Sequence, residues 1–388
     1  MSNAYLSRGV SATKDDVHKA ISHQDAGEFS GTFCKLIPDP CGDAAYCAVM
    51  HADGAGTKSS LAYLVYRETG DLRPLRQLAV DAVVMNLDDM LCVGALGPFV
   101  LSNTIGRNAH VVDGSCIKAI IEGYEDICRT LGDYGIDMRL AGGETADVGD
   151  LTRTLIVDAT CFARMPRAEV INCNGIQPGD VIVGLASFGQ AVYETQYNAG
   201  MGSNGLTAAR HLLFHHDYAA KYPETYSPTI DESLVYCGPY HVSDILPGTS
   251  VTVGDAVLSP TRTYAPILRD VLLKHRDAIH GIIHCTGGGQ TKCKNFGQGL
   301  HYIKEDLFDL PPLFSAIRET GSITPQEMYQ VFNMGHRMEL YTDRKTADCI
   351  ISIAQTYGVE AKIVGHTETA EDGKNRVTIR QDGEEWLY

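Results

Sequence analysis

Hydrophobic positions along the chain fall into short apolar runs and longer, largely apolar stretches, separated by polar turns rich in Gly and Pro. The short runs have the length of buried strands, and the longer stretches predict helices. We predict strands over residues 46–52, 137–140, 155–164, 180–185, 281–284 and 359–364. We predict helices over residues 78–93, 114–131, 206–213, 264–274 and 346–357. Because the two kinds of segment alternate throughout, the pattern predicts an α/β or α+β protein.

The length of 388 residues favours two domains, since a domain typically has about 100 to 200 residues. The polar stretch N-C-N-G-I-Q-P-G-D, which follows Met165-Pro166, is the best candidate for the junction. We therefore expect an N-terminal domain over 1–168 and a C-terminal domain over 169–388. The segment 214–254, rich in Tyr, His, Pro and Ser, is expected to form irregular connections on the surface.

The composition narrows the function classes. Hydrophobic residues make up 44% and charged residues 21%, as in ordinary globular domains, while the net charge of −16 with no basic cluster argues against nucleic-acid binding. The twelve cysteines include no C-x-x-C pair, so a zinc or redox enzyme is disfavoured and most thiols should be buried. No apolar run approaches a membrane span, and the N-terminus is too polar for a signal peptide, so a cytoplasmic location is expected.

Acidic residues beside glycines are the first candidates for chemistry. Asp53 ends a predicted strand and opens the segment Asp53-Gly54-Ala55-Gly56-Thr57-Lys58, whose glycines would let backbone N–H groups approach a ligand. An aspartate there either holds a cation or caps a turn, with Lys58 as a solvated charge in the second case. The segment is not a Walker A loop, because Thr57 stands between the glycine and the lysine.

Two further groups of acidic residues are also candidates for binding a cation. Asp81 and Asp88 are seven residues apart in a predicted apolar helix, so they share one face, with Asp89 beside them. Burying them requires a cation or strong donors, and a solvated helix face is the alternative. The third group is Ala141-Gly142-Gly143-Glu144-Thr145-Ala146-Asp147, read as a glycine loop after a short strand, with a plain turn as the alternative. Oxygen ligands of this kind suit Mg²⁺ on substrate phosphates, so we predict a site for metal and nucleotide.

Two glycine clusters are candidates for anion binding. Gly202-Ser203-Asn204-Gly205 precedes the predicted helix 206–213, and Thr286-Gly287-Gly288-Gly289 follows a predicted strand. Each would present free N–H groups to a phosphate, and a simple tight turn is the alternative for both.

The motifs together resemble those of one family, the phosphoribosylformylglycinamidine cyclo-ligases, also called aminoimidazole ribonucleotide synthetases. The resemblance spans nearly the whole chain, and the acidic motifs are shared with a wider ATP-using superfamily. The motifs, in chain order, are H-A-D-G-A-G-T-K (51–58), A-V-D (79–81) with N-L-D-D (86–89), G-G-E-T-A-D (142–147), G-S-N-G-L (202–206), L-S-P-T-R-T-Y (258–264), T-G-G-G (286–289) and E-M-Y-x-x-F-N-x-G (327–335).

The resemblance implies a two-domain α/β fold in which an N-terminal domain dimerises through a shared β-barrel and a larger α/β domain follows. It implies ATP-dependent ring closure of formylglycinamidine ribonucleotide by a homodimer that binds neither nucleic acid nor membrane. By similarity, Mg²⁺ would be held by Asp53, Asp89 and Glu144, with Asp81, Asp88 and Asp147 as neighbours. Lys58 would approach a phosphate or pair with these acids, and Asp53, Lys58 and Asn204 would serve catalysis. The implied nucleotide-binding residues are Asp53, Gly54, Gly56, Thr57, Lys58, Asp81, Gly142, Gly143, Thr145, Gly287 and Gly288.

The sequence departs from the family pattern in several places. Many relatives have His where this chain has Gly202, and an insertion over 192–201 offers Tyr193, Glu194 or Tyr197 as substitutes. The segment 27–35 is a loose counterpart of a glycine-rich family segment, and 214–254 is longer than in compact relatives. Alternative functions are a selenophosphate synthetase-like enzyme, a small-molecule kinase of the thiamine-phosphate type, and a catalytically silent nucleotide-binding subunit. The motifs L-S-P-T-R-T-Y and E-M-Y-x-x-F-N favour the cyclo-ligase.

Overall fold

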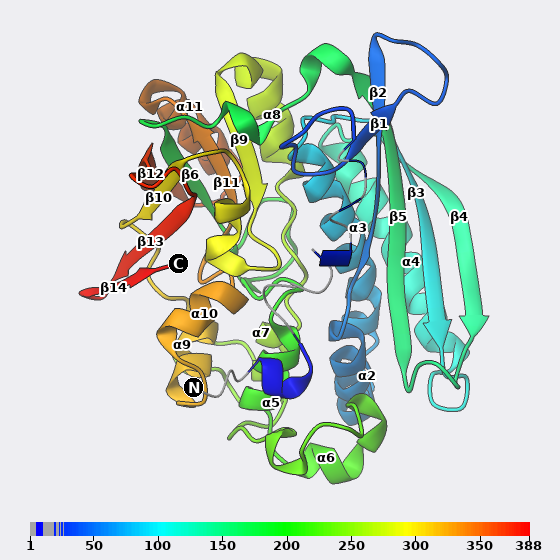
Figure 1. Ribbon diagram of the computed structural model, residues 1–388. Helices are drawn as coiled ribbons and strands as arrows, with labels where there is room; N and C mark the ends of the chain where they lie inside the picture. The colour runs from blue at the N-terminus through cyan, green and yellow to red at the C-terminus, as the bar shows by residue number, and fades with distance from the viewer. Residues whose placement is uncertain (1–4, 11–18, 21–22, 24, 26) are drawn as a thin grey trace.

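The computed structural model describes residues 5–10, 19, 20, 23, 25 and 27–388, and it contains two large sheets with helices packed on them (Figure 1). The predicted α/β class is confirmed. The first sheet has the strand order β1-β2-β5-β3-β4. Its strands are β1 (Leu36–Pro38), β2 (Tyr46–Gly54), β3 (Phe99–Arg107), β4 (Met138–Asp147) and β5 (Leu155–Pro166).

Helices cover one face of this first sheet, the inner face in Figure 1. They are α2 (Lys58–Thr69), α3 (Arg73–Leu91) and α4 (Gly114–Asp133), and α3 is buried over most of its length. Helix α3 begins five residues before the predicted 78–93 because Pro74 in its first turn has a backbone already suited to a helix start. Helix α4 begins at the predicted residue because Asp113 accepts hydrogen bonds from the backbone N–H groups of Ser115 and Cys116.

The segment G-G-E-T-A-D is not the glycine loop that the sequence predicted. Strand β4 continues through it to Asp147, and β4 pairs in parallel with β3. A Cβ built on Gly143 would lie 2.0 Å from Oδ1 of Asn103 on β3, so only glycine lets the two strands approach at this register. The same correction applies to Asp53, which lies within β2 and not in a loop after it.

The second sheet has the order β14-β13-β10-β12-β6-β11-β9, and β7 pairs with β8 in a separate hairpin. Strands β13 and β14 form an antiparallel pair beyond the last strand that the sequence predicted, 359–364. The left-handed backbone of Asp382 and Gly383 makes the turn between them. The strands are β6 (Val181–Ala186), β7 (Phe188–Gly189), β8 (Asn198–Ala199), β9 (Ile279–His284), β10 (Leu300–Lys304), β11 (His336–Thr342), β12 (Ala361–Thr369), β13 (Arg376–Gln381) and β14 (Glu384–Leu387).

The helices of the second half surround this sheet. Helix α5 has the predicted bounds, and α8 and α11 lie within two residues of their predictions at each end. The α-helices are α5 (Leu206–Leu213), α6 (Asp217–Lys221), α7 (Val253–Val257), α8 (Ala265–His275), α9 (Pro312–Glu319), α10 (Pro325–Val331) and α11 (Arg344–Thr356). The 3-10 helices in the described part of the chain are η1 (Leu6–Arg8), η2 (Arg167–Glu169), η3 (Cys173–Gly175), η4 (Pro223–Thr225), η5 (Glu232–Leu234), η6 (Arg276–Ala278) and η7 (Gly289–Asn295).

The segment 214–254 is largely irregular, as predicted, but it is not simply a surface connection. Tyr218, Tyr222 and Tyr236 are buried, and their rings contact one another or other aromatic rings. These rings join the segment to the hydrophobic core of the molecule, because each ring removes a large apolar area from water.

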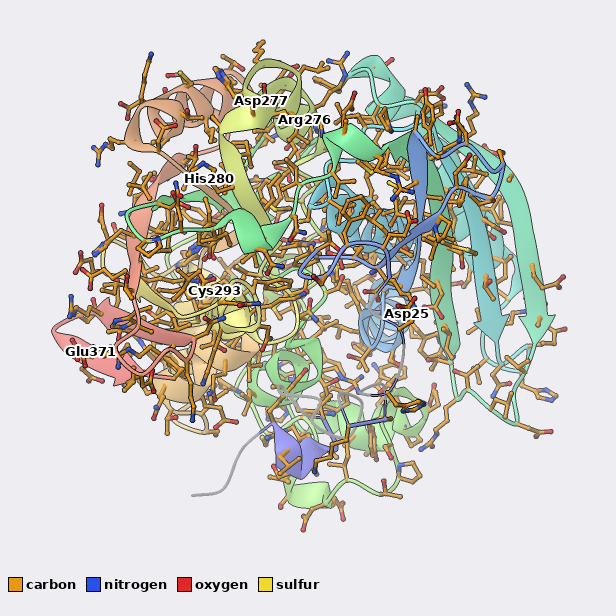
Figure 2. The ribbon with its side chains drawn as sticks, turned by 45° about the horizontal axis from the view of Figure 1, so that its top comes forward. Asp25, Arg276, Asp277, His280, Cys293 and Glu371 are labelled. Atoms are coloured by element: carbon orange, nitrogen blue, oxygen red, sulfur yellow. The ribbon has the colours of Figure 1, made fainter. Side chains whose placement is uncertain are left out.

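Direct hydrogen bonds tie the two halves together. In the view of Figure 2, Arg276, Asp277 and His280 lie together at the start of β9. From there Arg276 reaches the first half, where its Nη1 donates to the backbone oxygen of Gly94 at 3.0 Å. Among the described residues, no helix combines the length and the apolar character that crossing a membrane requires. All twelve cysteines are free and eight of them are buried, which confirms the expectation for the thiols.

Candidate functional site

A cavity of about 220 Å³ lies between the two halves of the molecule. Thr57 reaches it from the start of α2, while Asn204 and Gly205 come from the loop before α5, and Gly287 and Gly288 from the loop after β9. The fold thus brings together residues that the sequence predicted from three separate motifs. A second cavity of about 390 Å³ shares Thr57 with the first and is lined by three arginines, Arg8, Arg153 and Arg210.

The cavity has donors suited to an anion. Helix α5 begins at its edge, and in the part of the chain that the structure describes no side chain caps this end. Gly205 precedes the helix with a φ of 78°, and Gly288 on the opposite loop has a φ of 96°, so both turns require glycine. Backbone N–H groups at such a helix start attract phosphate oxygens. The side-chain oxygen of Asn204 is buried without a hydrogen-bond partner among the described residues, which leaves it available for a ligand.

Lys58 and Asp81 form a buried ion pair beneath this cavity. Nζ of Lys58 lies 2.6 Å from Oδ1 of Asp81 and 2.8 Å from the backbone oxygen of Ser259, and the lysine is 1% exposed. Burial lowers the pKa of Lys58, while the charge of Asp81 opposes this shift. Asp81 also accepts hydrogen bonds from Ser203 and Thr261. Of the two roles that the sequence left open, the structure shows Lys58 paired with an acid.

Asp88, like Asp81, is buried and accepts hydrogen bonds from residues in the second half of the chain. Its carboxylate accepts from Oγ1 of Thr263 at 2.7 Å and from the backbone N–H of Tyr264 at 3.0 Å. Burial raises the pKa of Asp88 to about 7, and the hydrogen bond from Thr263 opposes the shift. The shared helix face predicted for Asp81 and Asp88 is therefore buried, and strong donors from the L-S-P-T-R-T-Y motif compensate both carboxylates.

Asp89 lies in a different polar cluster. Its Oδ1 accepts from Nδ1 of His284 at 2.6 Å, and its Oδ2 lies 3.4 Å from Nε2 of His51. Nε of Arg337 lies 2.9 Å from Nε2 of His284 and donates to it, so the His284 proton sits on Nδ1. Burial lowers the pKa of His284 to about 4, although the hydrogen bond to Asp89 opposes this, so His284 is neutral at pH 7.

The three acids predicted to hold one metal do not converge within a single chain. Asp53 on β2 pairs with Ala159 on β5. Ala159 in turn pairs with Asn103 on β3, and Asn103 pairs with Gly143 on β4, the neighbour of Glu144. Glu144 therefore lies three strand spacings from Asp53, a distance of about 14 Å. Gly142 and Thr145 share this remote edge strand, and Asp147 accepts a hydrogen bond from Arg107 there.

The insertion over 192–201 packs on the L-S-P-T-R-T-Y motif. Glu194 accepts from Nε of the buried Arg262 at 2.9 Å, and Tyr193 donates to the backbone oxygen of Thr263 at 2.6 Å. Two of the three side chains that the sequence offered as substitutes, Tyr193 and Glu194, are thus engaged in holding this loop. The sequence pattern did not single out His284 or Arg337. His284 directly follows the apolar run 281–283, which is a usable signal, whereas Arg337 lies in the mixed strand H-R-M-E-L-Y-T and gives none.

Two family models match the chain. One, described as AIR synthase related protein, N-terminal domain, matches residues 39–165, and the other, described as AIR synthase related protein, C-terminal domain, matches residues 177–378. A phosphoribosylformylglycinamidine cyclo-ligase from Methanococcus vannielii is 28% identical over 351 residues, covering 88% of this chain and 85% of the relative. A chloroplastic protein of the same name from Arabidopsis thaliana is 30% identical over 379 residues, covering 92% of this chain and 84% of the relative.

A solved structure described as T. maritima PurL complexed with FGAR has the same fold. The TM-score is 0.59 at 17% identity, and the match covers 99% of this chain but only 51% of that chain, so this protein spans about half its length. Together with the family models, these matches confirm the resemblance that the sequence motifs indicated.

Proposed function

Because this chain belongs to the AIR synthase related protein family, we propose that it is an ATP-dependent cyclo-ligase of purine biosynthesis. Its substrate would be formylglycinamidine ribonucleotide, and its product aminoimidazole ribonucleotide. The observation that carries this proposal is the cavity between the two halves, in which Thr57, Asn204 and Gly287 from three family motifs line one space.

The reaction must remove an amide oxygen, which is a poor leaving group. The amide oxygen attacks the γ-phosphorus of ATP, a new O–P bond forms, and the bond to ADP breaks. The neighbouring amine nitrogen then attacks the activated carbon, the C–O bond breaks with release of phosphate, and the nitrogen loses a proton. Such a sequence needs positioning and charge neutralisation more than a protein nucleophile.

The residues of the cavity fit these demands. We assign the N-terminus of α5 and the glycine loop 287–288 to the phosphates of ATP, since both present backbone N–H groups. Asn204 would bind the substrate or the nucleotide through its unpartnered oxygen. Lys58 and Asp81 would position the loops at Ser203 and Thr261, to which Asp81 is hydrogen-bonded.

Mg²⁺ would neutralise charge on the phosphoryl group in transfer. Asp53 fits this ion, because it presents carboxylate oxygens at the end of β2 and its side chain is exposed. Asp53 and His51 are two residues apart on β2, so their side chains share a face, and His51 contacts Asp89. Asp89 is therefore near Asp53, whereas Glu144 would join the same metal only from a second copy of the chain.

A homodimer would supply that second copy. The face of the first sheet opposite α3 carries an apolar row across three strands, in which Met50 pairs with Phe162 and Phe162 with Val100. Met50 is 64% exposed and Val100 is 39% exposed. Apolar side chains aligned on a strand surface favour burial against another surface, and the family resemblance makes a second copy the occupant that we propose.

The test is phosphate release from ATP and Mg²⁺ with and without formylglycinamidine ribonucleotide, with the product followed by mass spectrometry. We expect release only when the substrate is present. Asn204→Ala should lower turnover without lowering the melting temperature, and Thr229→Ala, at an exposed loop threonine, is the matched control. Release without substrate, or no release in either case, would contradict the proposal.

A further inference from the structure

Arg337 on β11 is a buried cation whose hydrogen-bond partners in the described part of the chain are all uncharged. Its Nε donates to the neutral ring of His284 at 2.9 Å, and its Nη2 donates to the backbone oxygen of Arg262. The side chain is 2% exposed, and Nη1 has no hydrogen-bond partner among the described residues. A buried charge is costly unless an opposite charge compensates it, so this guanidinium lacks an anion.

The guanidinium lies where three motifs of the candidate site meet. It contacts G-S-N-G-L through Gly202, since a Cβ built on that glycine would lie 2.9 Å from Nη1. It contacts L-S-P-T-R-T-Y through Arg262 and lies 5.5 Å from the ring centroid of Tyr264. His284, which accepts from Nε, comes two residues before T-G-G-G. Nη1 is therefore beside a loop whose next residue, Ser203, lines the cavity of about 220 Å³.

Asp88 is a carboxylate near Arg337 that is already engaged elsewhere. Burial raises the pKa of Asp88 to about 7, and the charge of Arg337 opposes this shift, so the two groups interact. The Asp88 oxygens, however, accept from Oγ1 of Thr263 and from the backbone N–H of Tyr264. Asp88 therefore does not supply the counter-charge that the guanidinium lacks.

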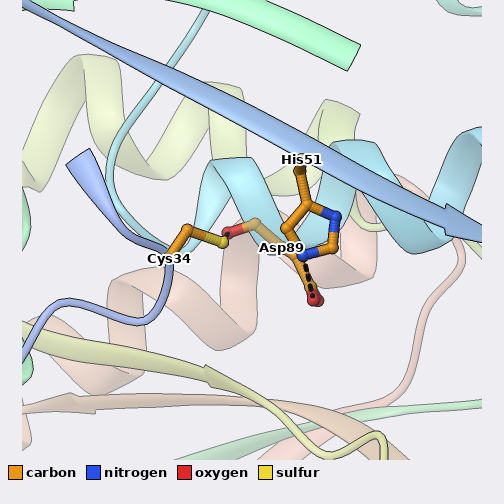
Figure 3. Close-up of side chains that lie close together, drawn as sticks. All are labelled: Cys34, His51 and Asp89. Atoms are coloured by element: carbon orange, nitrogen blue, oxygen red, sulfur yellow. Dashed lines mark hydrogen bonds and ion pairs between the residues drawn. The ribbon is translucent and has the colours of Figure 1, made fainter. Parts of the chain in front are cut away.

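Asp89 is separated from Arg337 by the imidazole of His284. Oδ1 of Asp89 accepts from Nδ1 of His284 at 2.6 Å, and Arg337 donates to the other ring nitrogen. Oδ2 of Asp89 faces His51, the contact that the dashed line in Figure 3 marks. Arg337 is therefore one imidazole away from an acid predicted to hold Mg²⁺. Because Mg²⁺ binds the terminal phosphates of ATP, these are the anions expected on this side of the site.

We propose that Arg337 binds a terminal phosphate of the nucleotide through Nη1. A phosphate supplies the negative charge that the guanidinium lacks, and guanidinium donors match phosphate oxygens. Arg337 is not among the residues that line the cavity, so the contact requires the loop 200–205 to shift when the nucleotide binds. Gly200 and Gly202, with φ values of 87° and 69°, allow this loop to rearrange at low steric cost. The assignment rests on the proposed nucleotide site but not on the ring closure.

The experiment measures nucleotide binding by the full chain with Mg²⁺ and without formylglycinamidine ribonucleotide. ATP is titrated by calorimetry, and AMP, which lacks the terminal phosphates, is followed by ligand-observed NMR. In Arg337→Gln the dissociation constant for ATP should rise about 10- to 100-fold, the effect of losing a hydrogen bond to a charged group, while that for AMP should change little. The melting temperature without nucleotide should fall little, because the variant removes an uncompensated buried charge.

Two other arginines provide matched controls. Arg262 is buried but paired with Glu194, so Arg262→Gln should lower the melting temperature strongly. Arg344 is exposed at the start of α11, and Arg344→Gln should leave ATP binding unchanged. Arg337→Lys, which keeps the charge, should lose less affinity and is the second variant if Arg337→Gln fails to fold.

Unchanged ATP affinity in a folded Arg337 variant, or an equal loss of affinity for ATP and AMP, would overturn the proposal. A wild-type protein that does not bind ATP would overturn both this assignment and the nucleotide site. ATP binding without ring closure would contradict only the proposed reaction, because the role of Arg337 is read from binding alone.

Discussion

Gly202 and Arg337 share one small space beside the candidate site. A Cβ built on Gly202 would lie 2.9 Å from Nη1 of Arg337, and Gly202 has a φ of 69°. Arg337 is 2% exposed, and its Nη1 has no hydrogen-bond partner among the described residues. Gly202 therefore leaves room for the large side chain of Arg337. Any side chain at position 202 would have to displace the buried guanidinium of Arg337.

Replacing Gly202 by histidine, the residue that the family resemblance leads us to expect there, should not raise turnover. The left-handed backbone and the contact with Arg337 both oppose a side chain, so we expect Gly202→His to lower the melting temperature and the activity. Thermal melts and steady-state phosphate release measure the two effects, and Gly202→Ala separates the backbone strain from the added volume. A stable Gly202→His protein with higher turnover would contradict this account.

Removing the charge of Glu194 should destabilise the protein strongly. Arg262 is buried and held by Glu194, so Glu194→Ala leaves a buried guanidinium without its ion pair, at a cost of about 3 kcal/mol or more. Chemical denaturation measures this loss, and Glu194→Gln, which keeps hydrogen-bonding capacity, should lose less.

Deleting 192–201 removes the same contact, so turnover should fall sharply while nucleotide binding persists. Steady-state assays beside a nucleotide titration check both expectations. Full activity after the deletion would show that the insertion only decorates the surface.

Asp53→Asn should impair catalysis far more than folding. The side chain is exposed at the end of β2, so its loss removes a proposed metal ligand without opening the core. We expect a higher Mg²⁺ requirement and a loss of several kcal/mol, about 100-fold or more in kcat/KM. A Mg²⁺ titration of turnover checks this. Wild-type kinetics at every Mg²⁺ concentration would exclude Asp53 from the site.

A charge placed on the outer face of the first sheet should weaken the proposed homodimer. Met50→Asp puts a carboxylate in the middle of the apolar row, where burial against a second copy would be costly. Light scattering at micromolar concentration should show a dimer for the wild type and a monomer mass for the variant. Leu151→Asp, at an 85% exposed loop residue, is the control. A monomeric wild-type protein would rule out the dimer.

His211 should make the protein less stable as the pH falls. Burial, together with the charges of Arg210 and Arg8, lowers the pKa of His211 to about 2, whereas its unfolded value is about 6.5. Below that unfolded value the unfolded chain binds a proton that the native state does not. Stability is therefore lost with decreasing pH at up to about 1.4 kcal/mol per pH unit.

The variant His211→Asn isolates this contribution. Nδ1 of His211 accepts from the backbone N–H of Tyr236 at 3.2 Å, and the asparagine oxygen can take over that role without titrating. Chemical denaturation between about pH 7 and pH 5 should give a shallower dependence for the variant. Parallel slopes for both proteins would exclude His211 as the source.

The sequence alone determined the elements and most of the motifs of the candidate site. Apolar periodicity predicted α5 at its observed bounds and α3, α4, α8 and α11 within a few residues, because these segments bury a continuous face that their spacing already reveals. It also predicted that Asp81 and Asp88 would share one helix face, with a buried face and a solvated face as the two alternatives. The sequence wrongly predicted a loop for the glycine motif around Glu144. Glycine residues occur both in turns and where two strands approach closely, and the sequence does not distinguish the two cases.

The partners of the acidic residues follow from the packing of the folded chain and could not be predicted from the sequence. Lys58 is five residues from Asp53 in sequence but pairs with Asp81 on another helix, and Glu144 is separated from Asp53 by the strand order β2-β5-β3-β4. Cys34, His51 and Asp89 meet although they come from three separate segments of the sequence. The physical reason is that periodicity depends on neighbours along one element, whereas a site depends on the order of strands and the packing of helices from distant parts of the chain.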